Sequence, residues 1–336
     1  MFLTPLVIRM SFSDLFPGFS GEYTVKEGRM RHVLGEGSFY FANSVFSNLF
    51  SNSDGGAICF SSQESSIHGY IGMENLLFSF CMSDGRGGAI FSSFSLNTEI
   101  SVLKTCGFVC CSINQADYGP HFGLFLTKNN IHQNLISVSF CGKNNTLSQG
   151  MDRLSEGNIS CQDVNTSYNC AFGNGGFHSV SAITCSSRRI TIVNNSVSHC
   201  RVLTSYNTSY SYFQNCNIVG NTQYTNEYGL VFANSNTDMI LESCVFISNS
   251  YDLFSIANDN VKLTIKNSWI QNSYKSSSVS ILNPLGATTS TILCSWYNNI
   301  QCFENALSKK ALTCHIKGRF ISMYLMMISW AIIASG

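Results

Sequence analysis

Short motifs recur along this chain at intervals of about thirty residues, and this repeat constrains the fold more than any other feature. The tetrapeptide Gly-Gly-Ala-Ile occurs at Gly55 and Gly56 and again, 32 residues later, at Gly87 and Gly88. A second motif, small-x-apolar-x-x-Asn, ends at Asn221, Asn249, Asn272 and Asn299. A period of this length is typical of solenoid proteins, in which each repeat buries its apolar face against the next.

The apolar position of the second motif extends over most of the chain. Ten such positions lie about 28 residues apart on average, 250 residues over nine intervals, at Phe46, Phe78, Phe108, Phe140, Phe172, Val197, Ile218, Phe246, Trp269 and Trp296. Between them apolar residues alternate with polar ones, as in Val261, Leu263 and Ile265, which is strand periodicity. Leucine-rich repeats share the period, but their Leu-x-x-Leu-x-Leu spine does not recur.

These patterns predict an all-β fold, a single-stranded right-handed parallel β-helix of about ten coils stacked about 4.8 Å apart. We expect an irregular N-terminal cap over residues 1–38, the β-helix over residues 39–305, and a basic linker with a hydrophobic segment over residues 306–336. We expect this last segment to contain a short hydrophobic helix. Asn234, Asn258 and Asn283 recur at the end of similar strands, so we expect them to stack as an amide ladder at one corner.

Charged residues are scarce in this chain and balance one another. They make up 11% of the sequence, and the 19 basic and 19 acidic residues give a formal net charge of zero. Binding to the phosphates of nucleic acids requires a strong positive charge on the protein, so we exclude a nucleic-acid partner. The 25 Phe and 14 Tyr residues exclude disorder, because they provide ample apolar surface to bury.

The Gly-Gly-Ala-Ile and Phe-x-x-Asn motifs, in repeats of about thirty residues, resemble those of the chlamydial polymorphic outer membrane proteins. They are also similar to the repeats of trichomonad surface proteins. The resemblance covers roughly residues 43–300. It implies an adhesin-like β-helix at the cell surface. No series of amphipathic strands follows residue 300, so a C-terminal translocator barrel is not expected here.

The two ends of the chain and its cysteines indicate the cellular location in which we expect the protein. Residues 1–8 are apolar but lack the basic start and cleavage site of a signal peptide. The 17 residues from Phe320 to Gly336 are uncharged, and they predict either a membrane anchor or a packed cap. We expect association with a membrane or the cell surface. Fifteen cysteines are too few for a disulfide scaffold, and we expect most to be buried inside the coils.

Residues suited to catalysis are scattered rather than clustered. Asp54 and Asp84 precede the two Gly-Gly turns and form the nearest approach to a carboxylate pair, but aspartate at these positions is typical of turns. The seven histidines form no metal-binding spacing. We therefore expect no enzymatic activity, no cofactor and no metal. A polysaccharide lyase or glycoside hydrolase on a β-helix, and a cytosolic structural scaffold, are the alternatives.

Tyr206, Tyr210 and Tyr212 lie in a stretch rich in hydroxyl groups and form our candidate contact patch. Tyrosine and serine supply adaptable contacts at low entropic cost, as in antibody paratopes. We expect adhesion to, or recognition of, an extracellular protein or glycan, whose identity the sequence does not determine. The alternative interpretation of this stretch is a loop between coils.

Overall fold

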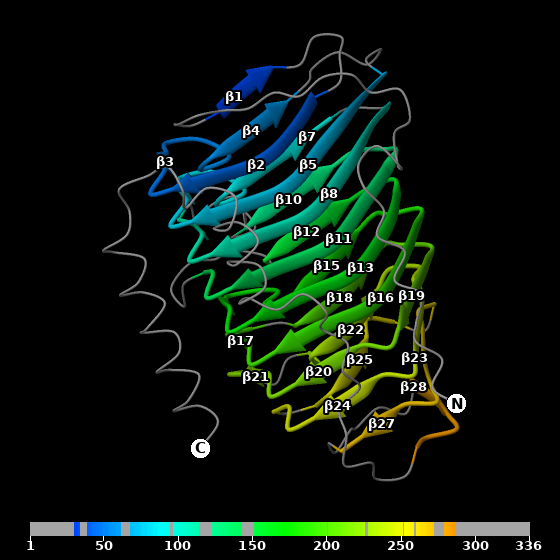
Figure 1. Cartoon of the computed structure of the whole chain (residues 1–336). Helices are drawn as coiled ribbons and strands as arrows, with labels where there is room; N and C mark the ends of the chain where they lie inside the picture. The colour runs from blue at the N-terminus through cyan, green and yellow to red at the C-terminus, as the bar shows by residue number, and fades with distance from the viewer. Residues whose placement is uncertain are drawn as a thin grey trace, which may run out of the picture.

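The chain is an all-β parallel solenoid of about seven turns (Figure 1). The computed structural model describes residues 30–33, 39–61, 68–94, 97–113, 122–142, 151–199, 201–225, 228–250, 252–258, 260–271 and 279–285. The predicted C-terminal helix and the turn residues Asn272 and Asn299 lie outside this part. The handedness and the number of ten coils stay predictions. No helix among the described residues is long and apolar enough to cross a membrane.

Two long sheets form the sides of the solenoid, and all their strands pair in parallel. The nine-stranded sheet contains, in spatial order, β1 Met30–Val33, β4 Ile58–Ser61, β7 Ile90–Ser93, β10 Gly123–Leu126, β12 Asp152–Ser155, β15 Phe177–Val180, β18 Leu203–Tyr206, β22 Val231–Asn234 and β25 Phe254–Ile256. Strand β1 falls within the range for which an irregular cap was expected, and it pairs with β4 over all four residues.

The thirteen-stranded sheet bends around the rod. It contains β2 Phe39–Ser47, β5 His68–Ser79, β8 Asn97–Phe108, β11 Asn130–Ser139, β13 Asn158–Ser167, β16 Thr184–Val193, β19 Tyr210–Gln214, β23 Asp238–Glu242, β26 Lys262–Lys266 and β28 Val279–Leu282, together with β20 Asn217–Val219, β24 Val245–Ile247 and β27 Trp269–Ile270. Two small sheets complete the turns. They are β3 Phe50–Ser51, β6 Met82–Ser83 and β9 Cys111–Ser112, and β14 Cys170–Ala171, β17 Ser196–Val197 and β21 Thr222–Gln223.

The thirteen-stranded sheet bends at a column of residues whose backbone is in the left-handed conformation. Their φ angles lie between 48° and 58°, at Asn43, Asn75, Lys104, Leu135, Asp163, Arg189, Asn215, Ser243 and Asn267. Asparagine tolerates this conformation better than other residues with a side chain. This tolerance accounts for the four asparagines at this corner, Asn43, Asn75, Asn215 and Asn267.

The register of the strands shows that the ten apolar positions of the sequence motif do not all align in successive coils. Phe46 and Phe78 are partners, and their rings stack with centroids 4.9 Å apart. Phe78 then pairs with Gly107 rather than Phe108. Val197 belongs to a different, small sheet, because it lies on β17. Turns of unequal length shift the strands, so a nearly constant spacing in sequence does not preserve position in the coil.

A column of asparagines buried inside one corner joins successive coils. The side-chain amides of Asn195, Asn221 and Asn249 donate to the carbonyls of Thr166, Ile192 and Ile218, at 2.9, 2.8 and 2.7 Å. Each side-chain oxygen accepts the backbone N–H of the preceding member: Asn249 from Asn221, Asn221 from Asn195, and Asn195 from Asn169, at 3.0, 3.0 and 2.9 Å. The buried backbone N–H groups of Asn169, Asn195 and Asn221, which follow the strands, are satisfied in this way.

Cysteines occupy the same column towards the N-terminal end. Asn169 accepts the backbone N–H of Cys141 at 2.9 Å, and Cys141 Sγ accepts that of Cys110 at 3.2 Å. The thiols of Cys110 and Cys81 point at the carbonyls of Phe78 and Phe46, at 3.8 and 3.6 Å. A thiol is a weaker donor than an amide, so the asparagine half of the column holds its coils more firmly.

The three asparagines expected to form a ladder do not come together. Asn234 ends β22 of the nine-stranded sheet, and the exposed Asn258 lies beyond β25, one residue out of register with it. Asn283 follows β28, which belongs to the thirteen-stranded sheet. A ladder of buried amides therefore exists, but Asn169, Asn195, Asn221 and Asn249 form it.

Replacing a member of the buried column tests its role. We expect Asn221→Ala to lower the free energy of unfolding by about 3 kcal/mol, because it leaves the buried Asn195 N–H without a partner and removes the amide donor that reaches the Ile192 carbonyl. The exposed Asn258→Ala is the control, with a loss below about 1 kcal/mol. Urea denaturation followed by circular dichroism measures both variants, and equal losses would contradict the proposed role of the column.

Candidate functional site

The glycines of the two Gly-Gly-Ala-Ile motifs form turns that stack directly on one another. Gly55 and Gly87 have φ angles of 68° and 69°, a conformation that residues with side chains rarely adopt. A Cβ atom on Gly56 would lie 2.1 Å from the carbonyl oxygen of Gly88. The second glycine is thus required because two coils approach closely, and the first because of its backbone conformation.

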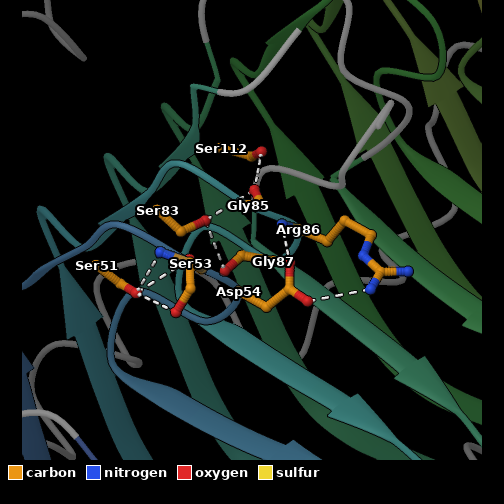
Figure 2. A network of polar contacts seen from close by, with 8 residues as sticks. All are labelled: Ser51, Ser53, Asp54, Ser83, Gly85, Arg86, Gly87 and Ser112. Atoms are coloured by element: carbon orange, nitrogen blue, oxygen red, sulfur yellow. Dashed lines mark hydrogen bonds and ion pairs between the residues drawn. The ribbon is translucent and has the colours of Figure 1, made fainter. Parts of the chain in front are cut away.

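A polar network surrounds these turns (Figure 2). The carboxylate of Asp54 accepts the backbone N–H of Arg86 at 2.6 Å and its guanidinium at 3.1 Å. The guanidinium carbon also lies 4.9 Å from the centroid of the Phe91 ring. Asp84, the other member of the suggested carboxylate pair, donates its backbone N–H to Ser51 at 2.8 Å. Asp54 therefore joins two coils through an ion pair, which is a structural role.

Serines extend the network over three coils. Ser83 Oγ donates to the carbonyl of Gly85 at 3.0 Å, and Ser112 Oγ donates to the same carbonyl at 2.5 Å. In the preceding coil Ser51 Oγ donates to the carbonyl of Ser53 at 3.0 Å. Figure 2 shows these side chains gathered at the turns of successive coils. Because these serine hydroxyls hydrogen-bond to carbonyls of the stacked turns, the network stabilises the stack.

An acidic side chain is buried inside the solenoid. Asp152 points inward from β12, and its Oδ2 accepts the amide of Gln133 at 2.5 Å. Its Oδ1 has no hydrogen-bond partner among the described residues. Burial raises the pKa of Asp152 to about 7, although the Gln133 hydrogen bond opposes this shift. The sequence contains no motif that distinguishes this aspartate from the turn aspartates.

The polar interior continues towards the C-terminal end. Cys161 Sγ lies 3.7 Å from Gln133 Oε1, and burial raises the pKa of the nearby Cys185 to about 11. Ser179 donates to Ser205 at 3.1 Å. Polar groups that hydrogen-bond to one another can be buried. A core that contains them is more sensitive than an apolar core to the ionisation of one of these groups.

The outer face of the thirteen-stranded sheet is open along the first halves of its strands, and we call this surface the open face. It carries Thr184, Ser186 and Arg188 of β16 and Tyr210 and Tyr212 of β19, whose neighbours in register continue the pattern. These side chains alternate with buried ones, and Tyr210 is 43% exposed. The open face combines aromatic, hydroxyl and charged groups on one side of the sheet.

Amide and hydroxyl side chains connect across the open face. Asn158 donates to Asn130 Oδ1 at 3.3 Å, and Thr184 donates to Asn158 Oδ1 at 3.0 Å. Glu99 accepts from Asn130 at 3.4 Å and contacts His132 Nε2 at 3.2 Å. These contacts hold the polar side chains in a row along the rod. Such a row presents amide and hydroxyl donors and acceptors, together with the Glu99 carboxylate, to a ligand.

The predicted tyrosine patch is divided between two surfaces. Tyr210 and Tyr212 lie on the open face, and the Tyr212 hydroxyl donates to Glu242 Oε2 at 2.5 Å. This bond, with a smaller effect of burial, raises the pKa of Tyr212 to about 12. Tyr206 ends β18 of the nine-stranded sheet, across the corner at Asn207, where φ is 49°. The patch thus contains two tyrosines rather than three.

Comparison with known protein families, curated proteins and solved structures finds no match to this chain. Among the described residues, no group of three or more His, Cys, Asp or Glu side chains could hold a metal ion.

Stability should depend on pH through Asp152. The pKa of Asp152 is raised in the folded protein, so its contribution is complete below about pH 4 and is lost as pH rises through about 7. Three pKa units correspond to a loss of about 4 kcal/mol. We expect Asp152→Asn to remove this dependence in urea denaturation between pH 4 and 8, whereas Asp238→Asn on the open face retains it. If Asp152→Asn kept the wild-type dependence of stability on pH, Asp152 would not be its cause.

Proposed function

We propose that the protein is a non-enzymatic recognition rod, associated with a cell surface or membrane, that binds an extracellular protein or glycan through the open face. The observation that carries this proposal is the exposed Tyr210 beside the half-buried Tyr212, within a row of hydroxyl and amide groups. Tyrosine is enriched at binding surfaces because a rigid, amphipathic ring contributes large contact area. The resemblance of the repeats to those of surface adhesins supports the same interpretation.

Charge on the open face favours an uncharged or zwitterionic ligand. Arg188, Lys262 and Lys266 contribute positive charge, and Asp238 and Glu242 contribute negative charge. In register, Asp238 lies beside Lys262 and Glu242 beside Lys266. Opposite charges placed side by side cancel at distances beyond about 10 Å at physiological salt. Long-range attraction of a polyanion is therefore weak, which supports the exclusion of nucleic acids.

Membrane association through the residues from Phe320 to Gly336 belongs to the same proposal. These residues lie outside the described part of the chain, and their uncharged sequence is the support for this role. Tags at the two ends of the chain, combined with protease accessibility in intact cells, test the location. Two protected tags on a soluble protein would favour the cytosolic scaffold instead.

Truncating the two tyrosines of the open face tests recognition directly. We expect Tyr210→Ser with Tyr212→Ser to weaken binding to the ligand identified on an array of glycans and extracellular proteins by roughly tenfold or more, about 1.4 kcal/mol. Tyr224→Ser is the matched control, because Tyr224 is 61% exposed beyond β21 of a small sheet. Equal binding by the double variant and the control would refute the open face as the site.

The enzymatic alternative is tested separately. Incubating the purified protein with pectin, hyaluronan and related polymers should produce no new reducing ends and no unsaturated products. Reproducible turnover that is lost in a variant of the Glu99 and His132 pair would replace the recognition proposal with a lyase or hydrolase.

A further inference from the structure

A row of side chains runs along the outer surface of the nine-stranded sheet, and we call it the outer row (Figure 1). Its members occupy one position of successive strands and pair in register, namely Cys59, Phe91, Leu124, Arg153, His178, Thr204 and Phe232. Leu154 and Phe177, which adjoin this row in sequence, pack in the main core. Successive residues of a strand point to opposite sides of a sheet, so the outer row faces away from the core.

Arg153, in the middle of the outer row, is half-buried and has no carboxylate partner among the described residues. Its Nε donates to Ser155 Oγ at 3.3 Å. Asp152, its neighbour in sequence, points into the solenoid and accepts a hydrogen bond from Gln133. Burial and the charge of Arg86 lower the pKa of Arg153, but an arginine remains charged at neutral pH. The guanidinium therefore keeps donors that no described carboxylate accepts.

Other arginines of the described chain show what a structural ion pair looks like here. The guanidinium of Arg189 donates to both oxygens of Asp163 at 2.6 Å, and Arg86 pairs with Asp54 at 3.1 Å. Each pair joins neighbouring coils. Arg153 instead donates to a serine hydroxyl of its own strand. This difference indicates that the anion for Arg153 comes from outside the described chain.

His178 lies directly beside Arg153 in register, and its Nε2 atom is a hydrogen-bond donor. Thr204 Oγ1 donates to Asn174 Oδ1 at 2.8 Å, which leaves the amide nitrogen of Asn174 as a donor. This nitrogen faces His178 Nδ1 at 3.2 Å, so Nδ1 accepts and the proton of the neutral ring lies on Nε2. Burial, and then the charges of Arg153 and Arg201, lower the pKa of His178 well below its ordinary value, so the ring is neutral.

Two further guanidinium groups lie over rings of the outer row. The guanidinium carbon of Arg86 is 4.9 Å from the Phe91 centroid, and that of Arg201 is 3.7 Å from the Phe232 centroid. Each ring lies two strands, or about 10 Å, from the nearer member of the central Arg and His pair. Because Asp54 already offsets the charge of Arg86, an anion is expected at the central pair rather than at that end of the row.

We propose that Arg153 and His178 form a binding site for an oxyanion, namely a carboxylate, sulfate or phosphate group, on the outer row. A planar guanidinium donates to two oxygens of such a group, and Nε2–H of His178 supplies a further donor. A neutral histidine donates without adding charge repulsion to the empty site. The half-buried Arg153 is the accessible member, so the anion approaches from its side of the pair.

The oxyanion is either a free inorganic ion or the acidic group of a small sugar, and the experiment separates these two sources. The site lies on the nine-stranded sheet, so the proposal does not depend on the function assigned to the open face.

Isothermal titration calorimetry of the full-length protein tests the site with sodium sulfate, sodium phosphate and a disaccharide that carries sulfate and carboxylate groups. Sodium chloride holds the ionic strength constant. We expect saturable binding at one site per chain, and Arg153→Gln should weaken it at least tenfold, because it removes a charged bidentate donor. Tighter binding of the disaccharide than of sulfate would identify a sugar as the source, and equal affinities would identify the free ion.

Arg188→Gln is the matched control, because it removes the same charge from an exposed position on the open face. It should bind each probe as the wild type does, and both variants should keep the wild-type circular dichroism spectrum. The absence of saturable binding for all three probes, or equal affinities of the two variants, would overturn the proposal.

Nitrogen-15 NMR of the histidine rings tests the geometry in the unaltered protein. At neutral pH the His178 signal, identified by its loss in His178→Gln, should show the proton on Nε2. Sulfate at constant ionic strength should shift this signal and leave that of His132, on the open face, in place. A proton on Nδ1, or a His178 signal that sulfate does not move, would overturn the site even if calorimetry detected binding.

Discussion

Hydrogen bonding between successive coils is the constraint on which the rest of this structure depends. Strand pairing satisfies the backbone of the sheets, but the turns would leave buried N–H and C=O groups unsatisfied. Asn169, Asn195, Asn221 and Asn249 supply those partners at one corner, and cysteines continue their column. Each member bonds to neighbouring coils, so the coils must stand in one register for the column to form.

Different surfaces of the rod follow from this one register. Because corresponding residues of successive coils lie side by side, a residue type that recurs at one position becomes a continuous row. The interior thus contains polar groups around Asp152 and Gln133 within an apolar core that runs along the rod. On the outside, the same sheet carries an open face with Tyr210 and Tyr212, whereas Leu77 of β5 packs in a small cluster apart from the main core.

Local features of the site were predictable from the sequence, whereas alignments between coils were not. Gly55 and Gly87 were expected in turns because of their motif, and their φ angles agree with that expectation. The asparagine ladder was expected at Asn234, Asn258 and Asn283, which lie on different sheets or out of register. Coils differ in length by several residues, so equal spacing in sequence misaligns strands by one position, and one position reverses the direction of a side chain.

The sequence by itself determined the class of fold, the repeat of about thirty residues, the glycine turns and a low, balanced charge. These properties depend on neighbours close in the chain, such as the alternation of apolar residues within a strand. Only the tertiary structure decided which asparagines meet, that Asp152 is buried, and that Tyr206 lies on a different sheet from Tyr210 and Tyr212. Those outcomes depend on contacts between residues of different coils, 19 or more positions apart, and the packing of whole coils sets them.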